Sequence, residues 1–448
     1  MKKLLLLLLL TTSLFSSVGI EEAWRVIEDK NSALAAAKED IAAAQHKRSS
    51  VKSMYLPNIS LSASYTHLDK VIDFDTSKVA ELMAFYGITL FPSSVDLSKE
   101  DIFLADLQLM WPLYVGGKID AAQDLYSAKV DEAKAMLAMQ KDKTFLKLIK
   151  YYYGVVVAES LYKTRSDALK ALQLHYENAK KLYNEGQIAK VELLNAQVKR
   201  DAAEIEKEKA ADRVNLTKRA LGLLIGSKAT LASPLFVYES RENLRDFQEQ
   251  LHNKSATLSL FDAKKREANS LITVKEAAFK PDVIGFADYN LYKDDSLMME
   301  SMPNWSAGVL VKFDILARED RTEELEIAKL TNSKVLLLKK EALQNLEILL
   351  QKSYDEMHSA YKEFHALNSS LALAQENYRL RSLSFKEGVA TSSDVVDAEL
   401  FLESVKTKRA NAAYTFVQRL AELLILSGER ERFFEILKSS EIELLEQQ

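Results

Sequence analysis

Two stretches of the chain, YNEGQIAKVELLNAQ at 183–197 and FKEGVATSSDVVDAE at 385–399, share one pattern. Each contains an aromatic residue, one variable residue, Glu and Gly, and after five residues an acidic residue, two aliphatic residues, a polar residue and Ala. Glycine is the residue that most often ends a helix and lets the chain turn into the next one. The two stretches therefore predict two helix corners, one at Gly186 and one at Gly388.

The similarity between the two halves extends well beyond the corners. At a constant offset of 202 residues, the matching pairs are Tyr176 and Tyr378, Leu221 and Leu423, and Gly226 and Gly428. Nearer the N-terminus the offset becomes 224 residues, and the matching pairs are Pro57 and Pro281, and Tyr65 and Tyr289. This internal similarity predicts a tandem duplication of about 200 residues. The difference of 22 residues indicates an insertion in the first copy, where VAELMAFYGITLF (79–91) is expected to form a short helix.

The N-terminal residues suggest export from the cytoplasm. MKKLLLLLLLTTSLFSSVG combines two lysines, a leucine run and small polar residues, which is typical of a secretory signal peptide. The apolar run is shorter than the roughly 20 residues that a transmembrane helix needs. We expect five parts: a signal peptide over 1–19, a first structural repeat over 20–228, a linker over 229–250, a second structural repeat over 251–428 and a C-terminal tail over 429–448.

Very long helices are predicted in both repeats. All six prolines lie outside the helical segments, and the run 118–185 contains a single glycine, Gly154. At 1.5 Å per residue, a helix over 118–185 is about 100 Å long, and a partner over 319–387 is equally long. Such helices occur in coiled coils, membrane spans and helical arrays. With charged residues at 28% of the chain, a membrane span is excluded.

Three segments alternate apolar and polar residues with a period of two, which predicts β-strands. They are ISLSASYTHL (59–68), DIFLADLQLMWPL (101–113) and a segment that alternates from Ser306 to Ile315. A fourth strand is expected in FKPDVIGFADY (279–289), which matches YLPNISLSASY (55–65) of the first copy. Alternation alone fits a half-buried soluble hairpin equally well. The signal peptide, the length near ten residues and the aromatic residues toward the ends favour an outer-membrane barrel.

Four strands cannot close a barrel, and an open sheet edge is not tolerated in hydrocarbon. The barrel must therefore be completed by other copies of the chain. Two copies would supply eight strands, whose interior fills with side chains, and three would supply twelve, which leaves a passage. We expect a homo-oligomer, most simply a trimer.

Composition and motifs exclude several other classes of protein. The chain has no cysteine, which removes disulfides, thiolate metal sites and the lipid-attachment cysteine of a bacterial lipoprotein. A net charge of −5 gives no reason to expect nucleic-acid binding. No P-loop, HExxH motif or nucleophile elbow is present, so no enzyme activity and no cofactor are expected. His358 and His365 do not supply two ligands one helical turn apart, so no metal site is expected.

The order of these features resembles the TolC family of outer-membrane channel proteins over essentially the whole chain after residue 19. The resemblance rests on the duplication and the two glycine corners, and on EEAWRVIEDKNSALAAAKEDIAAAQ (21–45), SMYLPNISLSASYTH (53–67) and WPLYVGGKIDAA (111–122). It implies a mainly α-helical, tandem-duplicated protomer with a small transmembrane β part. Three protomers would form a twelve-stranded outer-membrane β-barrel, continued by a twelve-helix periplasmic α-barrel with residues 229–250 in an equatorial belt.

The resemblance implies a gate at the periplasmic tip, where acidic rings lie just inside the helix corners. On this sequence the gate falls on Asp394 and Asp397, with Glu192 at the matching position of the first corner. A spacing of three residues places the two aspartates on one helix face. In a trimer their carboxylates would favour cations, and like-charge crowding would raise some of their pKa values. The alternative is that these residues cap a helix N-terminus.

The resemblance also implies partners and a function. The partners are two further copies of the chain, a periplasmic adaptor (membrane fusion protein), an inner-membrane pump of RND or ABC type, and outer-membrane lipid. The residues expected to contact the adaptor are Glu185, Gly186, Gln187, Glu387, Gly388 and Val389. The implied function is that of a passive exit duct in a tripartite efflux or type I secretion system, located in the outer membrane with a periplasmic extension.

Two departures from the family pattern affect these expectations. Family members often carry Val-Gly-Thr or Val-Gly-Ala at the corners. The adaptor of this chain is therefore expected to differ from the best-known adaptors of the family. An arginine that is common in the second corner is replaced by Ala390, so the links that hold the closed state are also expected to differ. The residues leave one alternative, a periplasmic coiled-coil scaffold or adaptor without a pore, but a scaffold has no use for lipid-facing strands.

Overall fold

A computed structural model describes residues 17–226, 230–231, 233–315 and 320–445. These residues form two compact units, and each unit draws segments from both repeats. One, the helical unit, contains the described residues up to Asp40, Ala133–Leu260 and the described residues from Leu338 onward. The other, the sheet unit, contains Ile41–Glu132 and Phe261–Leu337. Residues 1–16 of the expected signal peptide lie outside the described ranges.

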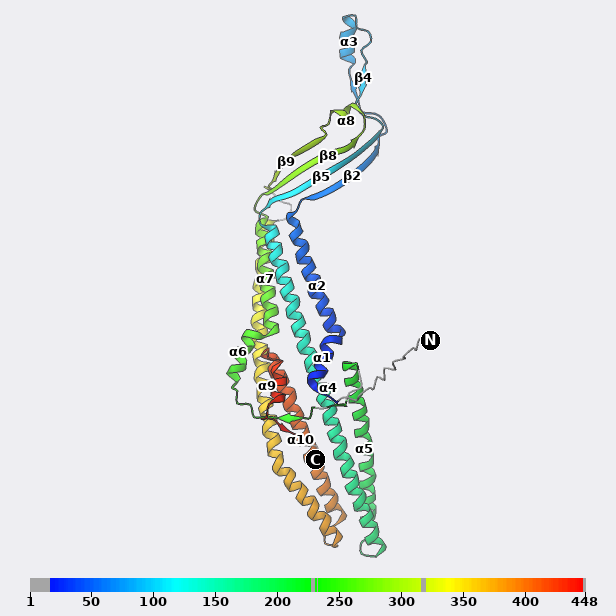
Figure 1. Cartoon of the computed structure of the whole chain (residues 1–448), viewed down its shortest axis with the longest axis vertical. Helices are drawn as coiled ribbons and strands as arrows, with labels where there is room; N and C mark the ends of the chain where they lie inside the picture. The colour runs from blue at the N-terminus through cyan, green and yellow to red at the C-terminus, as the bar shows by residue number, and fades with distance from the viewer. Residues whose placement is uncertain (1–16, 227–229, 232, 316–319, 446–448) are drawn as a thin grey trace, which may run out of the picture. The chain divides into compact units, whose positions relative to one another are not determined.

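The sheet unit is built on one antiparallel sheet with the strand order β2-β5-β8-β9 (Figure 1). Its strands are β2 (Asn58–His67), β5 (Asp101–Val115), β8 (Asp282–Lys293) and β9 (Trp305–Lys312). The two repeats therefore join in the middle of the sheet, where β5 of the first pairs with β8 of the second. Cross-strand pairing matches apolar residues, as in the contact of Tyr65 with Phe103, whose ring centroids lie 4.8 Å apart.

The two faces of the sheet differ in polarity, as the period of two predicts. On one face, Gln108 Nε2 donates to Asp288 Oδ1 at 3.0 Å, and Ser62 donates to Asp106. The other face carries large apolar side chains that this chain leaves exposed: Ile59, Leu61, Tyr65, Phe103, Leu107, Trp111, Tyr289, Trp305 and Val309. An apolar face of this extent is rare on a protein surface in water.

The fourth strand ends earlier than the sequence pattern predicted. Alternation continues to Ile315, but β9 ends at Lys312, which pairs with Asp282 at the start of β8. Asp282 follows Pro281, which has no N–H to extend the ladder. Pro112 lies inside β5, and the register against β8 shifts immediately after it.

The 22-residue insertion of the first repeat forms a small separate element of the sheet unit. Between β2 and β5 the chain forms β3 (Asp73–Asp75), α3 (Ser77–Phe85) and β4 (Ser94–Asp96), with β3 and β4 antiparallel. The short helix expected within 79–91 is therefore present. The second repeat has only α8 (Leu297–Ser301) at the matching place.

The helical unit contains the greater part of two helical hairpins that correspond to the two glycine corners (Figure 1). They are α4 (Lys118–Asn184) with α5 (Lys190–Ile225), and α9 (Arg321–Lys386) with α10 (Ser392–Leu426). The long helices predicted over 118–185 and 319–387 are confirmed to within two residues at each end. An ion pair of 2.6 Å from Lys218 to Glu159 joins α5 to α4, and one of 2.5 Å from Arg419 to Glu356 joins α10 to α9.

Aromatic side chains from distant parts of the chain form the core of the helical unit. Trp24, Phe145 and Phe433 are buried, with ring centroids 5.1 Å apart for Trp24 and Phe145 and 5.6 Å apart for Phe145 and Phe433. The YYYGVVV segment of α4 also contributes to this core, since Tyr152 and Tyr153 are fully buried. The run of aromatic and aliphatic residues in this segment is therefore explained by packing in the core.

Shorter elements complete the helical unit and lead into the sheet unit. The linker and the tail meet where β7 pairs antiparallel with β10. The shorter helices are α1 (Ile20–Lys30), α2 (Ser32–Lys52), α6 (Leu244–Lys254), α7 (Ala256–Ala277) and α11 (Arg432–Lys438), and the two-residue strands are β1 (Ser17–Val18), β6 (Thr230–Leu231), β7 (Phe236–Val237) and β10 (Glu443–Leu444).

Candidate functional site

Both predicted corners are helix–helix turns closed by a glycine in the left-handed region. Gly186 has a φ of 74° and Gly388 a φ of 71°. After each glycine a backbone N–H returns to the preceding helix, from Gln187 to Leu182 O at 2.8 Å and from Val389 to Ser384 O at 2.9 Å. This bonding satisfies carbonyls at the helix end and needs a residue without a Cβ penalty at positive φ.

The six residues expected to contact an adaptor all lie on the exposed surface of these two turns. They are Glu185, Gly186, Gln187, Glu387, Gly388 and Val389. Val389 is 83% exposed, which leaves a large apolar side chain uncovered at the second turn. In the single chain, the two turns are therefore accessible to another molecule.

Asp394 forms a capping box at the start of α10. Its Oδ2 accepts from the backbone N–H of Thr391 at 2.8 Å, and its own N–H donates to Thr391 Oγ1 at 3.3 Å. Arg381 Nη1 lies 3.7 Å from Asp394 Oδ1. The Thr391 hydrogen bonds, helped by Arg381, lower the pKa of Asp394. Within one chain the alternative role considered for this residue, helix capping, is thus present.

The other two expected gate residues have different surroundings. Asp397 is exposed one turn further along α10. Glu192 Oε2 accepts a hydrogen bond of 3.0 Å from the backbone N–H of Ser392, the first residue of α10. The start of α5 has no side-chain cap of its own, because Ala189 occupies the N-cap. Glu192 therefore caps the neighbouring hairpin, and the structure brings it close to the N-terminus that carries the two aspartates.

A buried histidine makes a second link between the hairpins beside Glu192. His175 of α4 is 4% exposed, and its Nε2 lies 2.6 Å from Oγ of the fully buried Ser392. The His175 ring also contacts Phe385 of α9, with centroids 4.4 Å apart. Burial lowers the pKa of His175 to about 4, so the imidazole is neutral at pH 7. Ser392 therefore joins α10 to both α4 and α5.

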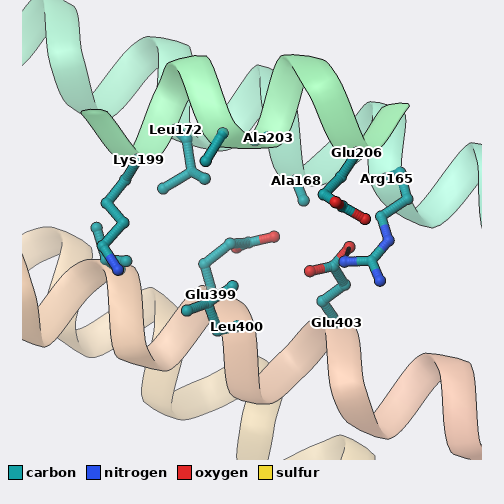
Figure 2. Close-up of a pocket in the computed structure, with 11 residues that line it drawn as sticks. Arg165, Ala168, Leu172, Lys199, Ala203, Glu206, Glu399, Leu400 and Glu403 are labelled. Carbon is teal, nitrogen blue, oxygen red and sulfur yellow. Dashed lines mark hydrogen bonds and ion pairs between the residues drawn. The ribbon is translucent and has the colours of Figure 1, made fainter. Parts of the chain in front are cut away.

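Further along α10, charged residues lie between the hairpins (Figure 2). Arg165 of α4 forms an ion pair with Glu403, whose side chain is 93% buried. Glu399 and Glu206 line the same cavity, which has a volume of about 150 Å³. Burial raises the pKa of Glu403, and the neighbouring Arg165 guanidinium opposes this effect. The pair therefore fixes the hairpins to each other at a second level.

Sequence reasoning missed Arg381, His175 and the pair of Glu399 and Glu403. Glu399 ends one of the two matching stretches, where the first copy has Gln197, but nothing in the pattern shows which face of α10 is covered. Arg381 lies thirteen residues before Asp394 on the other side of the turn. The absence of an arginine at Ala390 was visible in the sequence, whereas the approach of Arg381 to Asp394 depends on the folded turn.

The two histidines that were considered as metal ligands pack against tyrosines. The His358 ring lies 4.4 Å from Tyr354 and the His365 ring 4.4 Å from Tyr361, measured between centroids. His365 Nε2 is also 3.5 Å from a carboxylate oxygen of Glu443. Over the described part of the chain, no group of three or more His, Cys, Asp or Glu side chains could hold a metal ion.

None of the helices in the described ranges has the length and apolar character needed to cross a membrane.

One family model matches the chain over most of its length. The model of the outer membrane efflux protein family matches residues 25–227 and 247–429. No curated protein matches the sequence.

Three similar solved structures share the fold over nearly the whole chain. The outer membrane protein VceC from Vibrio cholerae is 17% identical with a TM-score of 0.75, covering 91% of this chain and 96% of that chain. CusC is 15% identical with a TM-score of 0.76, covering 93% and 95%. The CmeC outer membrane channel of Campylobacter jejuni is 14% identical with a TM-score of 0.76, covering 95% and 90%. At these identities the likeness concerns the fold.

Proposed function

Because the chain belongs to the outer membrane efflux protein family, we propose that it is the outer-membrane exit duct of a tripartite efflux or type I secretion system. The membership confirms the resemblance noted on the sequence. In this proposal three copies conduct substrates passively. A periplasmic adaptor joins the duct to an inner-membrane pump of RND or ABC type, which supplies the energy. The duct resides in the outer membrane, extends into the periplasm and carries no lipid anchor.

The observation that carries the proposal is the sheet of four strands with an exposed apolar face. Among the described strands, β2 and β9 each pair on one side only. Lipid would cover the apolar face, but unpaired backbone groups at the two edges cost several kcal/mol each in hydrocarbon. Pairing β9 of one copy with β2 of the next removes every edge, and three copies give a barrel of twelve strands. This closure supports the trimer.

A second observation supports assembly through the helices. Five apolar residues of α5 that this chain leaves exposed fall into two sets spaced by seven residues: Val191, Val198 and Ile205, and Leu216 and Leu223. We call these five residues the α5 row. A spacing of seven keeps side chains on one face of a helix that packs against another helix. The α5 row therefore suits a helix of a neighbouring copy.

The gate and the adaptor contact are further parts of the proposal. Asp394 and Asp397, repeated by threefold symmetry with Glu192 beside them, would surround the entrance with carboxylates and favour cations. The capping role of Asp394 is compatible with this ring, because 38% of its side chain remains exposed and Asp397 is exposed. The exposed turns at Gly186 and Gly388 would receive the adaptor.

The alternative, a periplasmic scaffold without a pore, predicts different behaviour in the cell. Separation of the two membranes on a density gradient tests the choice, with the mass of the purified protein measured in detergent. We expect the protein in the outer-membrane fraction with the mass of three chains. Recovery of a soluble periplasmic protein would favour the scaffold.

A further inference from the structure

Between the two hairpins lies a buried carboxylate with one oxygen that has no hydrogen-bond partner in the described structure. Glu399 is 5% exposed, and its Oε2 has no hydrogen-bond partner within the described residues. Figure 2 shows the carboxylate of Glu399 directed into the space between α10 and the α4–α5 hairpin. Leu172 and Leu400 line the same cavity of about 150 Å³, so part of its wall is apolar.

The neighbouring residue Glu403 shows what Glu399 lacks. The two carboxylates are four residues apart on α10 and are almost equally buried, at 5% and 6% exposure. Glu403 has the guanidinium of Arg165 as its partner. An ionised carboxylate without such a partner is costly to bury, and the group responds by holding its proton.

Charged or titratable groups face Glu399 from every helix around it. From α4 come Arg165 and Asp167, from α5 Lys199 and Glu206, from α10 Glu403 and Lys406, and from α9 Tyr378. Burial is the largest influence and raises the pKa of Glu399 to about 7, with Lys406 opposing it and Glu403 and Asp167 adding to it.

We propose that Glu399 is a proton-binding site that couples the docking of the two hairpins to pH. In the docked hairpins the cavity holds Glu399 with its proton. When the proton is lost, a bare carboxylate remains between α10 and the α4–α5 hairpin, and separation of the hairpins lets water solvate it. If the proposed channel function holds, the links at Ser392 near the tip loosen in the same movement, and the entrance opens.

The direction of the pH effect follows from the two pKa values. The pKa is about 7 in the docked state, against 4.5 for a solvated glutamate. Below pH 4.5 both states hold the proton, and docking is strongest. As the pH rises toward 7 the separated state loses its proton first, so docking weakens by up to about two orders of magnitude. Above pH 7 the docked state is ionised as well, and the weakening is complete.

A proton fits this site better than a metal ion does. Of the three carboxylates that line the cavity, Glu403 is already paired with Arg165. The described residues also contain no cluster of three metal-ligating side chains. A proton removes the charge of Glu399 without any further ligand.

The first test detects the proton itself and does not depend on channel activity. Infrared difference spectra of the full-length protein between pH 5 and pH 9 report the C=O stretch of a protonated carboxyl group. We expect a band that titrates near pH 7 in the parent, is missing in Glu399→Gln and is retained in Glu208→Gln, which neutralises an exposed glutamate of α5. Identical titration in the parent and in Glu399→Gln would overturn the proposal.

The second test measures separation of the hairpins and uses the absence of native cysteine. Ala196, which is 1% exposed in a cluster with Ala179, Phe385 and Val395, is replaced by Cys and labelled with a maleimide. Gln187→Cys, at an exposed turn, provides the reference rate at each pH. From pH 5 to pH 9 we expect the ratio of the two rates to rise at least tenfold in the parent and to remain flat in Glu399→Gln.

The outcomes separate this inference from the proposed function. A ratio that rises equally in the parent and in Glu399→Gln would overturn the coupling, as would a ratio that follows the Na⁺ concentration at constant pH. Both readouts apply to a protein that does not conduct ions. A channel without conductance but with both expected results would leave the protonation and the docking effect established and would refute only the duct.

Discussion

Helices α5 and α10 occupy the same place in the two repeats, and their surroundings in the chain are very different. They begin at Lys190 and Ser392, 202 residues apart, after the same kind of glycine turn. Along α10 seventeen residues are buried, whereas along α5 only Ala196, Leu221 and Ile225 are buried. The duplication preserved the signals that form the helix, but one copy is embedded in its own chain and the other is largely uncovered.

The difference indicates which surface is reserved for another molecule. The α5 row of Val191, Val198, Ile205, Leu216 and Leu223 is between 52% and 88% exposed. Three of the five positions that match it in α10 carry polar residues: Ser393, Thr407 and Gln418. The apolar row is thus a property of the first copy alone. The following predictions use the two helices and their turns as matched pairs.

Disruption of the α5 row should have the largest effect. Val198→Asp with Ile205→Asp leaves the single chain almost unaffected, because both side chains are exposed in it, but places charges in an apolar contact between copies. Burying each charge costs several kcal/mol, so we expect monomers in place of trimers. Native mass spectrometry checks the mass, with Ser404→Asp, an exposed position of α10, as the control that stays trimeric. A trimer in the double variant would mean that α5 does not contact a neighbouring copy.

Replacement of the turn glycines should have a smaller effect that is equal in both hairpins. A Cβ at Gly186 or Gly388 meets no atom within 4 Å, so the cost comes only from the positive φ. We expect Gly186→Ala and Gly388→Ala each to destabilise the protein by about 1 kcal/mol in urea unfolding.

A glycine in the interior of α4 supplies a control of opposite sign. Gly154 lies inside α4, and an added Cβ there meets only Tyr414 Oη at an ordinary 3.6 Å. Gly154→Ala should stabilise the protein by about 0.5–1 kcal/mol. A clear difference in the free energy of unfolding between Gly186→Ala and Gly388→Ala would show that the two turns contribute unequally to the stability of the assembly.

The acids after the second turn should separate capping from gating. Asp394→Ala loses the capping box and should speed amide exchange severalfold in the first turn of α10, whereas Asp397→Ala should not. Since hydrogen bonds lower the pKa of Asp394, its stabilising effect is complete above its ordinary pKa and is lost as the pH falls through the lowered value. Exchange measured by mass spectrometry from pH 5 downward checks both statements. Equal exchange in the two variants would remove the capping role.

The smallest effect on stability is expected from a conservative substitution of Glu192. Glu192→Gln keeps an oxygen that accepts from the Ser392 N–H, so we expect little change. Glu192→Ala leaves the first residue of α10 without this acceptor and should cost about 1 kcal/mol. Protection of the Ser392 amide against exchange distinguishes the two variants. Equal protection in both would show that the link does not form in solution.

The sequence was sufficient for features that depend on local patterns. Proline and glycine positions predicted the ends of α4 and α9, and the period of two, together with the match between the two copies, predicted the strands and their two faces. The pattern failed at Ile315, because the end of β9 depends on its partner strand, where Pro281 stops the ladder. The insertion was visible only because the second copy lacks it.

The candidate site was predicted in its position but not in its contacts. Asp394, Asp397 and Glu192 lie at the start of α10 and α5, as expected from the two corners. The contacts of His175 with Ser392 and of Arg165 with Glu403 join residues more than 200 positions apart, and no spacing rule relates them. Such pairs follow from how the hairpins pack.

Single-channel conductance of the purified protein in a planar bilayer tests the central claim most directly. The parent and the Asp394→Asn/Asp397→Asn variant are compared at equal trimer content. The proposed duct predicts a small, cation-selective conductance in the parent, and a larger or unselective conductance in the variant. The absence of conductance from well-folded trimers of both proteins would contradict the duct and favour a scaffold.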